Sequence, residues 1–306
     1  MPSVSGRVWK KPTMNPMVQE AVAGYLFVLP TVLSFLIFLA IPLVSGLGLA
    51  FVSWDFFSTP RFVGLNNFVA LSRDRIFATT VRNTAVFAFS ATALNVGLGM
   101  TIAIGINSIK RSWARSLLRS AYFVPFVVSG VVTALLFQFL LQESLGVVNY
   151  YLVRLGFGRV PWLTSSRWAM RSIIMLDVWR AVGFYVLIFL AGLQGIPAEL
   201  YEAAEVDGAK RWAKVTRITL PLLTPTLFFS LIIALIGAFQ VFDAVYVLTD
   251  GGPGDATRTI VMYLYRQAFG SYNMGYAAAI ALVLFIIILF FTVIQFKMGD
   301  KWVFYR

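Results

Sequence analysis

Few side chains in this 306-residue sequence could carry out acid–base or nucleophilic chemistry. There is no Cys and no His, which excludes thiolate and imidazole metal sites, Cys and His nucleophiles and histidine-based acid–base catalysis. The charged residues inside long apolar stretches are Asp177, Arg180 and Asp243. Because burying a charge is costly, these three residues are candidates for a functional polar site.

Each candidate also has a structural interpretation. Asp177 and Arg180 are three residues apart and could neutralise each other on one helix face. Asp243 lies near the end of its apolar stretch and could reach water, and Gln240 can share a helical face with it. A polar pathway could be lined by Asn95, Asp177, Arg180, Gln240, Asp243 and Tyr246. We predict no catalytic residue and no metal site.

A second polar region, residues 196–221, reads as two short helices. Pro197 fits a first helical turn, and Glu199 and Glu202 complement the positive end of the first helix. Asp207 and Gly208 predict its end, because glycine readily adopts positive φ.

The second short helix of this region is basic and amphipathic. It could lie on anionic lipid with Trp212 at the headgroup level. Alternatively, the region could dock another protein, because the small residues Ala203 and Ala204 allow a close approach to the backbone. The basic side chains are those of Lys210, Arg211, Lys214 and Arg217.

The composition indicates a membrane protein. Apolar residues make up 59% of the chain and charged residues 12%, with a mean hydropathy of +0.81, whereas soluble domains are about 45–50% apolar and about 25% charged. The net charge of +12 would suggest nucleic acid binding in a soluble protein. Here the bases lie between apolar runs, so we expect contact with membrane lipid and none with nucleic acid.

Six apolar runs are long enough to cross a bilayer as helices. We therefore expect an all-α integral membrane protein with six transmembrane helices, and we expect the first run to be a retained span, since it is longer than the core of a signal peptide. The runs are 21–54, 83–109, 120–142, 172–198, 218–242 and 267–296.

The distribution of bases predicts that both termini are cytoplasmic. With that orientation, 14 Lys and Arg residues lie inside and 10 outside. The short linker between the second and third runs holds four bases, whereas the outer loops are longer, as the positive-inside rule requires. The bases of that linker are Lys110, Arg111, Arg115 and Arg119.

The spacing in the 196–221 region matches a known motif. Glu202-Ala203-Ala204, three residues, Gly208, nine residues, Ile218, one residue and Leu220-Pro221 resemble the EAA loop of permease subunits of binding-protein-dependent ABC importers. Four further segments resemble the carbohydrate branch of that family, the maltose and glycerol-3-phosphate permease type. They are Phe62-Val-Gly-Leu-Asn-Asn-Phe68, Phe123-Val-Pro125, Trp179 with Gly183-Phe184, and Leu248-Thr-Asp-Gly-Gly-Pro253.

The resemblance implies a transport subunit of a prokaryotic cell membrane. In the family the EAA loop is the coupling helix that docks on a separate ATPase, so ATPase docking is assigned by resemblance to Glu202, Ala203, Ala204, Asp207 and Gly208. The implied partners are a second permease subunit, two ATPase subunits that hold ATP and Mg, and an extracytoplasmic solute-binding protein. The chain lacks a Gly-Lys dipeptide and hence a Walker A loop, so we expect no cofactor and no ATPase activity of its own.

These inferences define a domain plan and leave two rivals. We expect cytoplasmic tails at 1–20 and 298–306 around a permease domain at 21–297, forming half of a pathway for a sugar or related polyol.

The loop around Thr249-Asp-Gly-Gly-Pro-Gly254 is either a structural turn or, by resemblance, part of the gate or binding-protein contact. A stand-alone ion-coupled carrier or channel would carry an inverted repeat and midplane proton sites, and a membrane-embedded enzyme would need a nucleophile or metal set.

Overall fold

The computed structural model describes residues 16–304, which fall into two compact units divided after Leu49. The first unit is one continuous apolar helix built from α1 (Pro16–Phe35), a π-helical segment (Leu36–Ala40) and α2 (Ile41–Leu49). Its apolar part is long enough to cross a membrane. Most of the predicted tail at 1–20 lies outside the described residues, and helix α1 already begins at Pro16.

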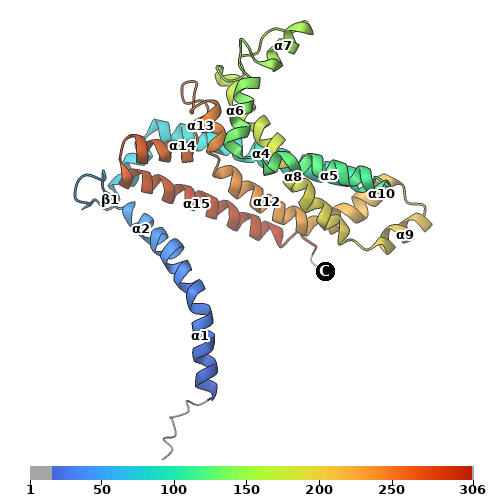
Figure 1. The fold of residues 1–306 in the computed structure, drawn as a ribbon, viewed down its shortest axis with the longest axis horizontal. Coiled ribbons are helices and arrows are strands. Elements are labelled where there is room, and N and C mark those ends of the chain that lie inside the picture. The colour runs from blue at the N-terminus through green and yellow to red at the C-terminus, as the bar shows by residue number, and fades with distance from the viewer. Residues whose placement is uncertain (1–15, 305–306) are drawn as a thin grey trace, which may run out of the picture. The chain divides into compact units, whose positions relative to one another are not determined.

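The second unit holds the remaining elements, almost all of them helical (Figure 1). A short antiparallel pair, β1 (Val52–Ser53) and β2 (Arg61–Phe62), precedes them. The helices are α3 (Asn66–Arg73), α4 (Arg75–Asn107), α5 (Ser112–Val127), α6 (Gly130–Leu140), α7 (Val147–Arg154), α8 (Ser166–Gln194), α9 (Ala198–Val206), α10 (Arg211–Lys214), α11 (Leu220–Leu222), α12 (Thr224–Phe239), α13 (Asp243–Leu248), α14 (Ile260–Tyr265) and α15 (Met274–Gly299). Two π-helical segments, Val215–Thr219 and Arg266–Gly270, extend α10 and α14.

The all-helical membrane fold is confirmed, and the six runs differ in continuity. Four helical segments, Glu20–Leu49, α4, α8 and α15, are each long and apolar enough to cross a membrane. The third and fifth predicted runs are bent pairs: α5 and α6 meet at 95°, and Arg211–Leu222 meets α12 at 63°. The described residues therefore contain four continuous spans, or six if each bent pair is one span.

Helix α8 packs between α4 and α5, and glycines make this close packing possible. A Cβ atom at Gly183 would lie 1.8 Å from the carbonyl oxygen of Tyr122 on α5. A Cβ atom at Gly99 on α4 would lie 2.7 Å from Cβ of Tyr185. Side chains at these positions would force the helices apart, so the two glycines fix the spacing of the three-helix core.

Asp74 joins the start of α4 to two other helices. Its Oδ1 caps α4 by accepting the backbone N–H groups of Ile76 at 2.8 Å and Phe77 at 3.2 Å. Its Oδ2 accepts the hydroxyl groups of Tyr263 on α14 at 2.5 Å and Tyr276 on α15 at 2.7 Å. One carboxylate thus holds α4, α14 and α15 together.

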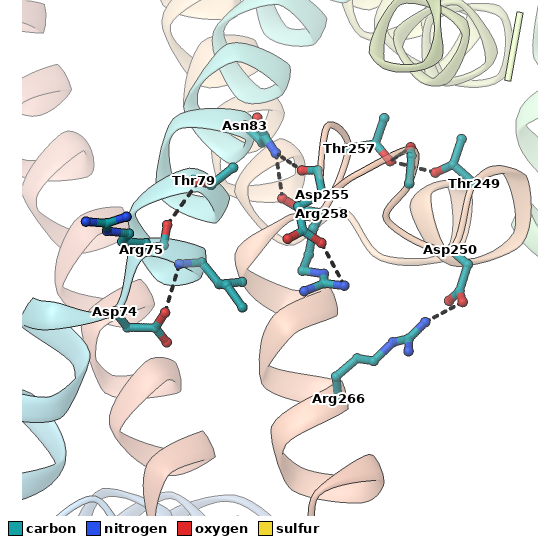
Figure 2. A network of polar contacts seen from close by, with 12 residues as sticks. Asp74, Arg75, Thr79, Asn83, Thr249, Asp250, Asp255, Thr257, Arg258 and Arg266 are labelled. Carbon is teal, nitrogen blue, oxygen red and sulfur yellow. Dashed lines mark hydrogen bonds and ion pairs between the residues drawn. The ribbon is translucent and has the colours of Figure 1, made fainter. Parts of the chain in front are cut away.

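The loop 249–259 is a structured turn fixed to α4 (Figure 2). Asn83 on α4 donates hydrogen bonds to the carbonyl oxygens of Asp255 at 2.7 Å and Arg258 at 3.0 Å, and an ion pair links Asp250 to Arg266. Gly251 adopts a φ of 85°. The loop is therefore a structural turn, the first of the two alternatives considered from the sequence, whereas a role in the gate or in binding-protein contact stays a prediction.

Candidate functional site

The first predicted site, the EAA segment, is a short helix with a well-defined end. Helix α9 begins after Pro197 and ends at Val206, close to the prediction. Gly208 has a φ of 74°. The N–H of Gly208 donates a hydrogen bond to the carbonyl oxygen of Glu205 at 3.0 Å, and the N–H of Ala209 donates one to the carbonyl oxygen of Ala204 at 2.8 Å. This pair of bonds is a Schellman motif, which requires a residue that tolerates positive φ at position 208.

The predicted docking residues lie together on an accessible surface. Glu202, Ala203, Asp207 and Gly208 are exposed, and Ala204 is partly buried. Space is open around Gly208, where a Cβ atom would meet no atom within 4 Å. A neighbouring protein could therefore approach the backbone here.

Val206 belongs to the same surface and was missed from the sequence. Its side chain is 89% exposed on α9, although it is apolar and its neighbours in sequence are charged. An apolar residue two positions after the Glu-Ala-Ala triplet, between Glu205 and Asp207 at the predicted end of a short helix, was the available signal.

Two side-chain bonds fix α9 to the segment that leads into α12. Tyr201 Oη lies 2.9 Å from Oγ1 of Thr219, a buried residue. Lys214 Nζ lies 2.6 Å from Oε1 of Glu205. The hydrogen bond and charge of Lys214 lower the pKa of Glu205 below its ordinary value, so this carboxylate is ionised at neutral pH. These two contacts connect α9 to the segment that precedes α12.

The second site is a cavity of about 180 Å³ that brings four predicted residues together. Asp177 and Arg180 on α8, Gln240 after α12 and Asp243 at the start of α13 line it. The cavity also reaches Gly130, the first residue of α6. Carboxylate, guanidinium and amide groups that converge in this way can donate to and accept from a polyhydroxylated molecule.

Asn95 supports this cavity from α4. Its Nδ2 donates to Oδ2 of Asp177 at 2.9 Å, and Asn95 is almost fully buried. The hydrogen-bond partner of Asp177 is thus a neutral amide. Asp177 and Arg180 are not among the ion pairs of the described residues, contrary to the pairing considered from the sequence.

Arg180 and Asp243 instead lie close to the start of α6. A Cβ atom at Gly130 would lie 3.2 Å from Oδ2 of Asp243 and 3.6 Å from Nη1 of Arg180. Gly130 was missed from the sequence, although the pair Ser129-Gly130, which follows Pro125 closely, was a usable signal of a helix break.

Two further expectations about the polar pathway differ from the structure. Gln240 and Asp243 do not share a helical face, because α12 ends at Phe239 and α13 begins at Asp243; they meet across the break. Tyr246 does not line the cavity. Its ring stacks on that of Phe242 at 5.3 Å between centroids.

Within residues 16–304, no group of three or more carboxylates is placed to hold a metal ion. The two candidate sites differ in shape and in the chemistry of their side chains. The α9 surface is suited to protein contact, and the cavity is suited to a small polar ligand.

Comparison with known proteins identifies the family. Residues 95–298 match the family described as binding-protein-dependent transport system inner membrane component. This chain belongs to that family. It is a multi-pass inner-membrane permease subunit of a binding-protein-dependent ABC importer and is not itself catalytic. The family resemblance stated from the EAA motif is confirmed.

Named relatives come from the carbohydrate branch. The chain is 38% identical over 281 residues to the arabinooligosaccharides transport system permease protein of Bacillus subtilis, covering 91% of this chain and 89% of that protein. It is 36% identical over 285 residues to the trehalose/maltose transport system permease protein of Thermococcus litoralis, covering 92% and 95%.

A solved structure shares the fold of this permease over nearly its full length. It is described as a bacterial alginate ABC transporter in complex with an alginate pentasaccharide-bound periplasmic protein. The sequence identity is 29% and the TM-score is 0.83, and the match covers 93% of this chain and 96% of that chain.

Proposed function

We propose that this permease forms half of the pathway for a sugar or related polyol and is driven by a separate ATPase that grips α9. The supporting observation is the exposed Schellman-capped helix carrying Glu202, Ala203, Ala204, Asp207 and Gly208, tied to α12 through Tyr201 and Thr219. The proposed partners are a second permease subunit, two ATPase subunits that hold ATP and Mg, and an extracytoplasmic solute-binding protein.

The proposed orientation places both termini and α9 in the cytoplasm. The density of bases in the linker between α4 and α5 supports this arrangement. The proposed permease domain spans 21–297, with short tails on both sides. In this proposal, ATP-driven closure of the ATPase pair changes access to the cavity beside Asp177.

The cargo is proposed to be neutral. The cavity offers two carboxylates and an amide against one guanidinium, from Asp177, Asp243, Gln240 and Arg180. A phosphate would be repelled by the carboxylates and would require a bidentate Arg free of such neighbours. Hydroxyl groups of a sugar suit this set, and the relatives that transport oligosaccharides support the same class.

The test uses substitutions at Gly208 in the complete reconstituted transporter. A Gly208→Trp variant is expected to lose sugar uptake by more than tenfold while the subunit remains in the membrane, because the bulky side chain blocks docking. Gly156→Trp is the matched control, because Gly156 also has positive φ, at 84°, and open space around its Cβ position.

A second variant separates docking from backbone strain. Glu202→Lys leaves the helix end intact and reverses one exposed charge, and it is expected to reduce uptake and stimulated ATP hydrolysis together. Normal transport by both Gly208→Trp and Glu202→Lys would refute the docking role of α9. Uptake by the purified chain alone, without nucleotide, would favour the rival carrier.

A further inference from the structure

Another cavity, of about 620 Å³, lies where α6 and α13 end. It is bounded by the last turns of α6 and the turn after them, by Leu163 and Thr164, and by residues 247–250. We call it the loop cavity. Its volume lies within the range of about 300–1,000 Å³ that is typical of ligand pockets, and none of its lining residues lines the cavity beside Asp177.

The loop cavity lies along the same two helices that border the cavity beside Asp177. Helices α6 and α13 pack against each other, and Nε2 of Gln138 donates to the carbonyl oxygen of Val247 at 2.8 Å. Gly130 and Asp243 begin these helices at the first cavity, whereas Gln138 and Val247 line the loop cavity. The two cavities are therefore one to two helical turns apart along a shared pair of helices.

One wall of the loop cavity is fixed by a buried asparagine on α7. Asn149 is 2% exposed, and its Nδ2 donates to the carbonyl oxygens of Glu143 at 3.1 Å and Val160 at 2.9 Å. Its Oδ1 accepts the backbone N–H of Val160 and Nε1 of Trp162, both at 3.1 Å. All four hydrogen bonds that this carboxamide can form are made, so the segments that carry Glu143 and Thr164 are held side by side.

The opposite wall is the structured turn that follows α13 (Figure 2). Oγ1 of Thr249 lies 2.7 Å from Oγ1 of Thr257, which donates to the carbonyl oxygen of Gly252 at 2.8 Å. An ion pair with Arg266 holds Asp250. Because internal bonds fix both walls, the loop cavity is formed before any ligand arrives.

The side chains of the loop cavity combine hydrogen-bond acceptors with apolar surface. Gln142 and Glu143 are exposed, and Glu143 accepts the hydroxyl of Thr164 at 2.8 Å through one of its two carboxylate oxygens. The ring of Phe139 is 60% exposed. Within the part of the chain that the structure describes, no Lys or Arg lines this cavity. Such a set favours a neutral ligand with hydroxyl groups and an apolar face, and it disfavours a phosphate.

We propose that the loop cavity is an entry site that binds the neutral sugar before the sugar reaches the cavity beside Asp177. The inference rests on the proposed function and adds a second binding site to it. Gln142 and Glu143 form hydrogen bonds with sugar hydroxyls, and Phe139 packs against the apolar face of a sugar ring. Under the proposed orientation the loop cavity lies at the outer ends of the spans, where sugar arrives.

Thiol protection in the complete purified transporter tests the proposal. Thr164→Cys places a thiol of similar size in the loop cavity, and this chain has no other Cys. Ser166→Cys is the matched control, because Ser166 is exposed two residues further on and does not line the cavity. Trehalose, maltose and arabinotriose are each added without the binding protein, and alkylation of this chain by a maleimide is followed by mass spectrometry.

The expected result is selective protection by the sugar that the unmodified complex takes up fastest. At a saturating concentration this sugar is expected to slow alkylation of Thr164→Cys at least about fivefold and that of Ser166→Cys less than about twofold. Adding Gln142→Ala with Glu143→Gln to Thr164→Cys is expected to abolish most of the protection. An unchanged alkylation rate without sugar shows that the cavity keeps its shape in this variant.

Three results would overturn the entry site and leave the proposed function standing. The first is sugar uptake by the unmodified complex with no protection of Thr164→Cys. The second is full protection in the variant that also carries Gln142→Ala and Glu143→Gln. The third is protection by the sugar-free binding protein alone, which would assign the loop cavity to a protein contact. Uptake of none of the three sugars by the unmodified complex would contradict the proposed function and the entry site together.

Discussion

Asp74 shows how a single residue can hold the helices of this permease in place. Burial raises the pKa of its carboxyl, but the hydrogen bonds from Tyr263, Tyr276 and the amides of Phe77 and Ile76 outweigh burial and hold the pKa below its ordinary value. No local sequence pattern indicates this role, because the tyrosine partners are 189 and 202 residues away along the chain. Such bonds depend on the tertiary fold.

We predict that Asp74→Ala destabilises the subunit by about 2 kcal/mol, because two tyrosine hydroxyls and a helix start lose a charged acceptor. Because the folded pKa is lowered, this contribution is fully present above about pH 5, and it is lost as the pH falls below about 4 through the folded pKa. Thermal unfolding of the purified subunit at several pH values checks both statements. The exposed Asp300→Ala variant is the control, and equal stability of the two variants would contradict the prediction.

At the scale of elements, the sequence predicted the positions of the apolar helices better than the breaks within them. The runs of apolar residues located every span, and Pro197 and Gly208 marked the limits of α9 closely, because these signals are local. The 95° bend between α5 and α6 was not predicted. The bend is stabilised by distant contacts such as Gln138 Nε2 to the carbonyl of Val247 at 2.8 Å, which no local pattern shows.

The candidate cavity depends on such interruptions. Asp177 and Arg180 were found because charges in an apolar run are conspicuous. Their surroundings were not predictable, since Asp243 and Gly130 meet them only because α12 and α5 both end beside α8.

We predict that Tyr201→Phe partly uncouples the transporter. The variant loses the 2.9 Å contact with Thr219 that links α9 to the start of α12. Sugar moved per ATP hydrolysed is expected to fall about twofold or more, while the assembled complex is retained. Parallel measurement of uptake and phosphate release provides the ratio. Tyr150→Phe on α7 is the control, and an unchanged ratio in Tyr201→Phe would show that the contact transmits nothing.

For the whole molecule, α12 connects the two candidate sites. It starts after the segment bound to α9 (Figure 1) and is followed by Gln240, which lines the cavity. Sixteen helical residues extend over about 24 Å. Under the proposed function, α12 would carry a displacement at the proposed ATPase contact, across the 63° bend that precedes it, to the residues proposed to hold the sugar.

The most direct test of this account is cross-linking from a single cysteine. Because the natural chain has no Cys, Val206→Cys places a unique thiol on the exposed end of α9, and Leu155→Cys, 73% exposed after α7, is the control. In the assembled transporter Val206→Cys is expected to cross-link to the ATPase subunit and to resist a membrane-impermeant thiol reagent added outside cells. Labelling of Val206→Cys from outside, or cross-linking of Leu155→Cys to the ATPase, would contradict the account.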